Sequence, residues 1–169
     1  MATLILTVPH SGSFFLFKFL VAVLGLRGDM SSAQVITPES KVDFSHAHAK
    51  SSMVLPEGVY DSVIVTLRHP HKSCDTGKLM GTSADQIAHS WDSLNDRLSQ
   101  YKTKLFLAID GPEENRFPQL MAIAEHFGKG DLEAEVKKYA DAWEPVNKSP
   151  DVEGALAAAV ELYEGFIKI

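Results

Sequence analysis

The chain has 169 residues, of which 45% are hydrophobic, 22% charged and 9% aromatic, with 11 glycines and 8 prolines. A chain of this length can bury roughly 70% of its unfolded surface, and this composition excludes a disordered, collagen-like or coiled-coil protein. The net charge of −6 argues against a general nucleic-acid-binding surface, and the single cysteine, Cys74, cannot form an internal disulfide. We therefore expect one cytoplasmic domain over residues 1–169.

The first predicted elements are a strand and a helix joined by a tight turn. Residues 3–8 (TLILTV) are apolar without polar alternation, which is typical of a strand buried on both faces. Residues 9–12 (PHSG) break that strand, and an apolar helix is expected from about Ser13. The run 14–26 is predicted to be neither a membrane span nor a signal peptide, because Lys18 interrupts it and no cation precedes it.

Three further strands and one strongly amphipathic helix are predicted next. Residues 42–46, 62–67 and 104–109 have the composition of short buried strands. Ser83 and Gln86 form a capping-box pattern that predicts the start of a helix. The apolar face of this helix consists of Ile87, Trp91, Leu94, Leu98 and Tyr101.

Two more helices complete the predicted domain. The first is expected to end at Gly128, and the second to be capped by Ser149 with Pro150 in its first position. Their apolar faces consist of Phe117, Leu120, Ala124 and Phe127 in the first and of Leu156, Val160, Tyr163 and Ile167 in the second. Strands that alternate with helices indicate an α/β domain, a three-layer α/β/α fold with a mostly parallel sheet.

The turn after the first strand has the parts of a phosphate site. In an open parallel sheet, ligands bind beyond the carboxyl ends of the strands. Gly12 permits close approach of the backbone, Ser11 and Ser13 offer hydroxyl donors, and the first amides of the helix carry partial positive charge. An ordinary strand-to-helix turn with a serine cap is the alternative. Neither the G-x-x-x-x-G-K-[ST] nor the G-x-G-x-x-G pattern is present, which disfavours ordinary ATP hydrolysis.

Three segments resemble the sulfotransferase family. Residues 7–16 (TVPHSGSFFL) resemble the 5′-phosphosulfate loop, whose common form is T-Y-P-K-S-G-T-T-W-L. Residues 63–70 (VIVTLRHP) are similar to the family strand that ends in an arginine, and Thr76 stands eight residues after Arg68, where the family has a serine. Residues 44–48 (FSHAH) resemble the family segment F-I-K-T-H. Later segments, 104–128 and 143–151, also look like family sequence.

The resemblance implies a sulfotransferase-like, P-loop NTPase-like fold. It implies transfer of a sulfuryl group from 3′-phosphoadenosine 5′-phosphosulfate (PAPS) to a hydroxyl or amine of a small molecule or glycan, with adenosine 3′,5′-bisphosphate as the product. The implied catalytic residues are His48, as general base, and His10, beside the leaving phosphate. The implied donor-binding residues are His10, Ser11, Gly12, Ser13, Phe14, Phe15, Arg68 and Thr76.

Some residues depart from the family pattern. His10 stands where the family has Lys or Arg, and His46 where it often has Lys, so imidazoles with an ordinary pKa near 6.5 replace permanent cations. The family's C-terminal R-K-G-x-x-G-D-W segment is missing, and Lys137, Lys138 or Lys148 are candidates to supply its charge. The absence of the loop cation leaves a non-catalytic nucleotide-binding module as an alternative function.

A metal-dependent hydrolase is a third hypothesis. His46 and His48, and likewise His69 and His71, form H-x-H pairs, and alternate residues of a strand share a face on which they could chelate a metal such as zinc. No carboxylate stands in a matching motif, and Pro70 interrupts the second pair.

Three remaining features are interpreted as structural. Cys74 and Trp91 are expected to be packed core side chains. The acidic turn at 110–114 is expected to be a solvated loop.

Overall fold

A five-stranded sheet lies at the centre of the structure. The computed structural model describes residues 2–29, 42–49, 58–143 and 156–168. Within these ranges the strand order is β2-β3-β1-β4-β5, and every neighbouring pair is parallel. The strands are β1 (Ala2–Thr7), β2 (Gly28–Asp29), β3 (Phe44–His48), β4 (Tyr60–Leu67) and β5 (Thr103–Ala108).

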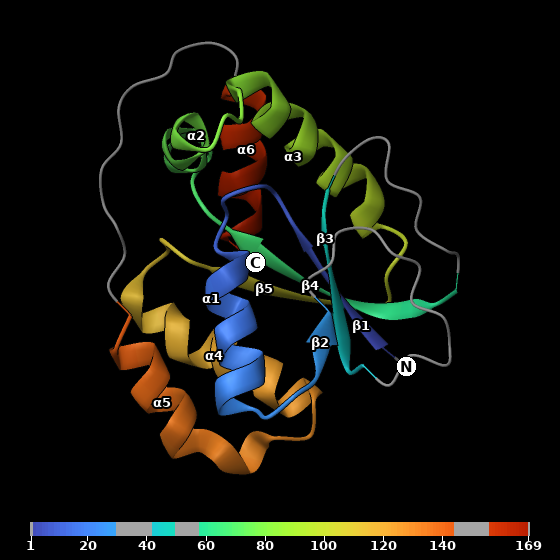
Figure 1. The fold of residues 1–169 in the computed structure, drawn as a ribbon, viewed down its shortest axis with the longest axis vertical. Coiled ribbons are helices and arrows are strands. Elements are labelled where there is room, and N and C mark those ends of the chain that lie inside the picture. The colour runs from blue at the N-terminus through green and yellow to red at the C-terminus, as the bar shows by residue number, and fades with distance from the viewer. Residues whose placement is uncertain (1, 30–41, 50–57, 144–155, 169) are drawn as a thin grey trace.

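Helices cover both faces of this sheet. Figure 1 shows α2, α3 and α6 on one side of the strands and α1, α4 and α5 on the other. No helix among the described residues is both long and apolar enough to cross a membrane. The helices are α1 (Ser13–Lys18), continued by the π-helical turn η1 (Phe19–Val23), α2 (Pro70–Leu79), α3 (Ala84–Leu98), α4 (Glu113–His126), the 3-10 turn η2 (Gly130–Leu132), α5 (Glu133–Asp141) and α6 (Ala157–Phe166).

The two faces of the sheet bury separate apolar cores because side chains alternate along each strand. Along β1, Leu4 and Leu6 pack in the core that contains Trp91 of α3. Ile5, between them, packs in the other core with Leu16 of α1. This arrangement confirms an α/β domain with a parallel sheet between two layers of helices.

Local sequence signals located most of the long elements. Four of the strands lie within two residues of their predicted bounds. The capping box of α3 is present, with Gln86 N–H donating to Ser83 Oγ and Ser83 N–H donating to Gln86 Oε1. Gly128, which follows α4, has a φ of 68°. Trp91 and Cys74 are buried core residues, as predicted. The predicted cap at Ser149 and Pro150 lies outside the described residues.

The chain changes direction in the sheet at β1. The segment after β1 leads through α1 to β2 and β3 on one side, whereas the segment after β4 leads through α2 and α3 to β5 on the other. Neighbouring strands whose connections leave over opposite faces have a crevice beyond their carboxyl ends, which is where open α/β sheets bind ligands. A ligand-binding site is therefore expected at the carboxyl ends of β1 and β4.

Candidate functional site

The loop after β1 is tightly shaped. His10 has a φ of 62° and Gly12 a φ of 96°, both in the left-handed region. This conformation costs a residue with a side chain roughly 1–2 kcal/mol, so His10 needs compensating contacts. A Cβ on Gly12 would lie 2.5 Å from Cγ1 of Ile109, just beyond β5, so only glycine fits there. The loop backbone is thus pressed against the end of the sheet.

Ser11 does not offer its hydroxyl to a ligand. The side chain is fully buried, and its hydroxyl donates to the carbonyl of Val8 at 2.7 Å. Since that uses its only hydrogen, the 2.8 Å contact with Thr66 Oγ1 is a hydrogen bond donated by Thr66. The expectation of a Ser11 hydroxyl donor is therefore wrong. Gly12, not a serine, occupies the cap position of α1, which begins at Ser13.

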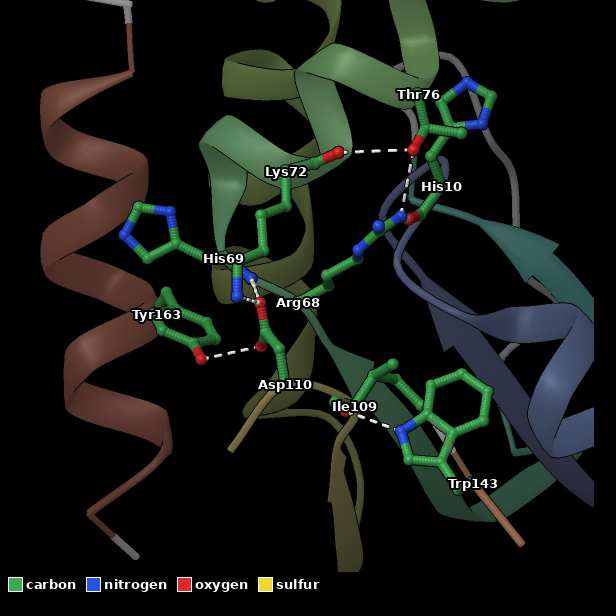
Figure 2. Close-up of polar contacts among 9 residues, drawn as sticks. All are labelled: His10, Arg68, His69, Lys72, Thr76, Ile109, Asp110, Trp143 and Tyr163. Atoms are coloured by element: carbon green, nitrogen blue, oxygen red, sulfur yellow. Dashed lines mark hydrogen bonds and ion pairs between the residues drawn. The ribbon is translucent and has the colours of Figure 1, made fainter. Parts of the chain in front are cut away.

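Arg68 joins the loop to α2. Its Nη1 donates to Oγ1 of Thr76 at 3.0 Å and to the carbonyl of His10 at 3.1 Å (Figure 2). The structure therefore brings together His10, Arg68 and Thr76, although 66 positions separate the first from the last. Both bonds come from Nη1, and the described residues accept none from Nε or Nη2 of Arg68. Those nitrogens keep donors that a phosphate oxygen can accept.

The ring of His10 is partly buried and contacts the turn after α2. Its Nε2 lies 3.0 Å from Oγ1 of Thr82, in the turn between α2 and α3. Burial, and then the positive charge of Arg68, lower the pKa of His10 below its ordinary value of 6.5. His10 is therefore neutral at pH 7 in the ligand-free protein, unlike the Lys or Arg of the sulfotransferase pattern.

Asp110, two residues after the end of β5, is a polar residue whose role the sequence did not reveal. Its side chain is 4% exposed, and its carboxylate lies 3.3 Å from Nζ of Lys72. It also accepts the backbone N–H of His69 at 2.9 Å and the hydroxyl of Tyr163 at 2.8 Å (Figure 2). The prediction of a solvated acidic turn is wrong for Asp110, since it links the ends of β4 and β5 to α6. The exposed Glu113 and Glu114 fit that prediction.

An aromatic pocket lies on the other flank of the loop. It has a volume of about 450 Å³. The rings of Phe15 and Trp143 are 3.9 Å apart between centroids, and the indole N–H of Trp143 donates to the carbonyl of Ile109 at 3.1 Å. Phe14 is 60% exposed, with Nζ of Lys18 4.7 Å from its ring centroid. The pocket is lined by Gly12, Phe14, Phe15, Lys18, Tyr139, Ala142 and Trp143.

His48 lies at the end of β3, on the same edge of the sheet. The register pairs it with Thr7, whose hydroxyl oxygen is 3.0 Å from its Nδ1. The imidazole of His46 shares this face, with 4.7 Å between the ring centroids. Burial, and then the charge of His48, lower the pKa of His46 to about 4. His46 is therefore a neutral, buried group and does not replace the cation expected at its position.

The second H-x-H pair does not lie on a strand. β4 ends at Leu67, His69 caps α2, and His71 lies within that helix. Among the described residues, no group of three or more His, Cys, Asp or Glu side chains is placed to hold a metal ion. Of the lysines proposed to supply the missing charge, Lys137 pairs with Asp141 at 2.9 Å and Lys148 lies outside the described residues.

No protein-family model matches the chain, and comparisons with curated proteins and with solved structures likewise found no significant match. The geometry of the site therefore carries the functional inference.

Proposed function

We propose that the chain is a PAPS-dependent sulfotransferase with a P-loop-like fold, acting on a hydroxyl or amine of a small molecule or glycan. The observation that carries the proposal is the contact of Arg68 with both Thr76 and the carbonyl of His10. These contacts hold Arg68 beside the glycine-containing loop, at the crevice between β1 and β4. Its remaining N–H groups can bind a phosphate bidentately there. The loop after β1 and the ends of β3 and β4, which belong to three segments that resemble the sulfotransferases, thus lie at one edge of the sheet.

Each part of the donor has a matching group in the proposal. The backbone from Gly12 to Phe14 would hold the 5′-phosphosulfate, because the first amides of a helix carry partial positive charge. Nε and Nη2 of Arg68 would hold the 3′-phosphate, and Thr76, which accepts a hydrogen bond from Nη1, would orient the guanidinium. The pocket beside Phe15 and Trp143 would take the adenine, whose flat ring stacks on aromatic side chains.

The reaction assigns one proton transfer to His48. The acceptor oxygen or nitrogen attacks the sulfur, a bond from sulfur to the acceptor forms, and the bond from sulfur to the bridging oxygen of the 5′-phosphate breaks. His48 takes the proton of the acceptor, and adenosine 3′,5′-bisphosphate leaves with the negative charge. Loop amides and a protonated His10 would stabilise that charge as it develops.

Product binding tests the donor assignment. We expect adenosine 3′,5′-bisphosphate to bind more tightly than ATP or AMP in titration calorimetry, since the site addresses two separated phosphates. Arg68→Ala should lose about 1.5–3 kcal/mol of that binding, the range for hydrogen bonds to charged groups. Arg27→Ala is the matched control, because Arg27 precedes β2 at the opposite edge of the sheet and its side chain is 67% exposed.

Turnover separates catalysis from binding. His48→Ala should leave the affinity for the bisphosphate nearly intact and lower turnover by about 10²–10⁴-fold, the usual contribution of a general base. Equal or undetectable binding of all three nucleotides would refute the donor site. Wild-type turnover in His48→Ala would show that His48 is not the base.

The second candidate function is a nucleotide-binding module without catalysis. It is favoured by the neutral state of His10, whose ring is engaged with Thr82. Tight bisphosphate binding without sulfuryl transfer to any acceptor in a panel of phenols, alcohols, amines and glycans would select it.

A further inference from the structure

One hydroxyl joins the two histidines of β3. Oγ1 of Thr7 lies 2.9 Å from Nε2 of His46 and 3.0 Å from Nδ1 of His48. His46 is only 5% exposed, whereas His48 is partly exposed at the end of the strand. The three side chains therefore form a row from the interior of the domain to the edge where the proposed reaction takes place.

The hydrogens in this row are coupled. A threonine hydroxyl has one hydrogen, so it donates to one ring and accepts from the other. If it donates to Nε2 of His46, the proton of His46 is on Nδ1, and His48 donates from Nδ1 and keeps a lone pair on Nε2. If it donates to His48 instead, both rings carry their proton on Nε2.

His46 is suited to take part only as a neutral ring. Burial lowers its pKa to about 4, so it does not become charged near neutral pH. Its Nδ1 is buried and has no hydrogen-bond partner among the described residues. In one arrangement Nδ1 of His46 carries an unpaired N–H, and in the other it carries an unpaired lone pair. The cost of burying that atom therefore does not select between the two arrangements.

We infer that Thr7 and His46 are positioning residues that fix the tautomer of His48, with its proton on Nδ1 and its lone pair on Nε2. This inference rests on the proposed function, since a general base needs that lone pair on the nitrogen that Thr7 does not contact. When Nε2 takes the proton of the acceptor, the N–H at Nδ1 goes on donating to Thr7. The imidazolium thus forms without any change in the row, and the proton later leaves to solvent.

Nitrogen-15 NMR of the ligand-free protein tests the inference without any need for turnover. In protein labelled at histidine nitrogens, at a pH where the rings are neutral, the wild type should show Nδ1–H for both His46 and His48. Resonances are assigned with His46→Leu and His48→Gln variants. A proton on Nε2 of His48 in the wild type would overturn the inference.

Variants of the row give signatures that a purely structural role would not produce. In His46→Leu the Thr7 hydroxyl loses its acceptor and should donate to His48, which moves the proton of His48 to Nε2. Thr7→Val should shift the tautomer populations of His48, while Thr7→Ser should retain the wild-type form. An unchanged His48 tautomer in Thr7→Val and His46→Leu would overturn the inference.

Kinetics distinguishes failure of this inference from failure of the proposed function. If the protein transfers sulfuryl groups, Thr7→Val should lower kcat by about 10–100-fold, the range known for partners that orient metal-bound histidines, with KM for the donor unchanged. Thr7→Ser should restore kcat. Absence of donor binding would refute the proposed function, whereas wild-type kcat in Thr7→Val would refute the role of Thr7 alone.

Discussion

The two flanks of the loop after β1 are built from different chemistry. The polar flank, on the side of α2 and α6, consists of Arg68, Lys72, Thr76, Asp110 and Tyr163, joined by hydrogen bonds and an ion pair. The aromatic flank, on the side of α1 and α5, consists of Phe14, Phe15, Tyr139 and Trp143 around an open pocket of about 450 Å³.

Under the proposed function, this difference indicates how the donor would be divided between the flanks. Fixed charges and oriented N–H groups favour phosphate, while exposed rings favour a flat base. A nucleotide with separated phosphates has both kinds of group. Substitutions on one flank at a time should therefore remove separate parts of its recognition.

Among the substitutions on the two flanks, the largest effect is expected in the polar flank, on the free energy of unfolding of the protein. Asp110→Ala should lower the free energy of unfolding by about 3 kcal/mol, because Lys72 and the backbone N–H of His69 lose the buried carboxylate that they contact. It also leaves the hydroxyl of Tyr163 without its acceptor. Urea denaturation measures the change. Asp141→Ala is the control, since its pair with Lys137 is exposed and should be worth less than about 1 kcal/mol. Equal effects of both substitutions would show that burial does not distinguish the two pairs.

A substitution in the aromatic flank should weaken recognition of the adenine base and leave recognition of the phosphates unchanged. Trp143→Ala should weaken binding of adenosine 3′,5′-bisphosphate by about 1–3 kcal/mol, the usual value of base stacking on an aromatic side chain. Binding of inorganic pyrophosphate should stay unchanged, whereas Arg68→Ala should weaken both ligands. Calorimetry with both ligands measures this, and Trp143→Phe should keep most of the affinity. A Trp143→Ala protein that loses pyrophosphate binding would break the proposed division.

The smallest expected effect is a pH dependence centred on His10. Its pKa is lowered in the free protein, and a bound dianion must raise it, so binding takes up a proton between the free and the bound pKa. Above pH 7, where the phosphates are already ionised, affinity for the bisphosphate should fall as pH rises and level off above the bound pKa. His10→Lys should flatten the profile between about pH 7 and 9. Parallel profiles in wild type and His10→Lys would show that His10 does not titrate on binding.

Much of the sheet was predictable because its strands are short apolar runs with local signals. α3 was predictable because a capping box and an apolar face coincide in one segment. β2, with two residues, has no detectable signal. α2 was missed because its sequence, PHKSCDTGKL, contains few apolar residues and a glycine, and it folds by packing Cys74 into the core.

The site was predictable only in part. Arg68 and Thr76 were paired through the family pattern, and the structure places them in contact. Asp110 was missed because its partners His69 and Tyr163 are 41 and 53 positions away and only the fold brings them near. The Ser11 side chain points inward and is hydrogen-bonded to Thr66 of β4. No local sequence pattern predicts that contact.

Ile109 contacts residues of the loop, of the aromatic flank and of the strand that precedes Arg68. Its side chain fills the space that a Cβ on Gly12 would need, and its carbonyl holds the indole of Trp143. Its own N–H donates to the carbonyl of Leu67, directly before Arg68, at 2.7 Å. A shift of the loop on binding phosphate would therefore reach the ring of Trp143 through Ile109. Groups that share a contact residue are commonly coupled by about 0.5–3 kcal/mol. Pyrophosphate bound at the loop should thus change the affinity of the protein for adenosine by a free energy in that range.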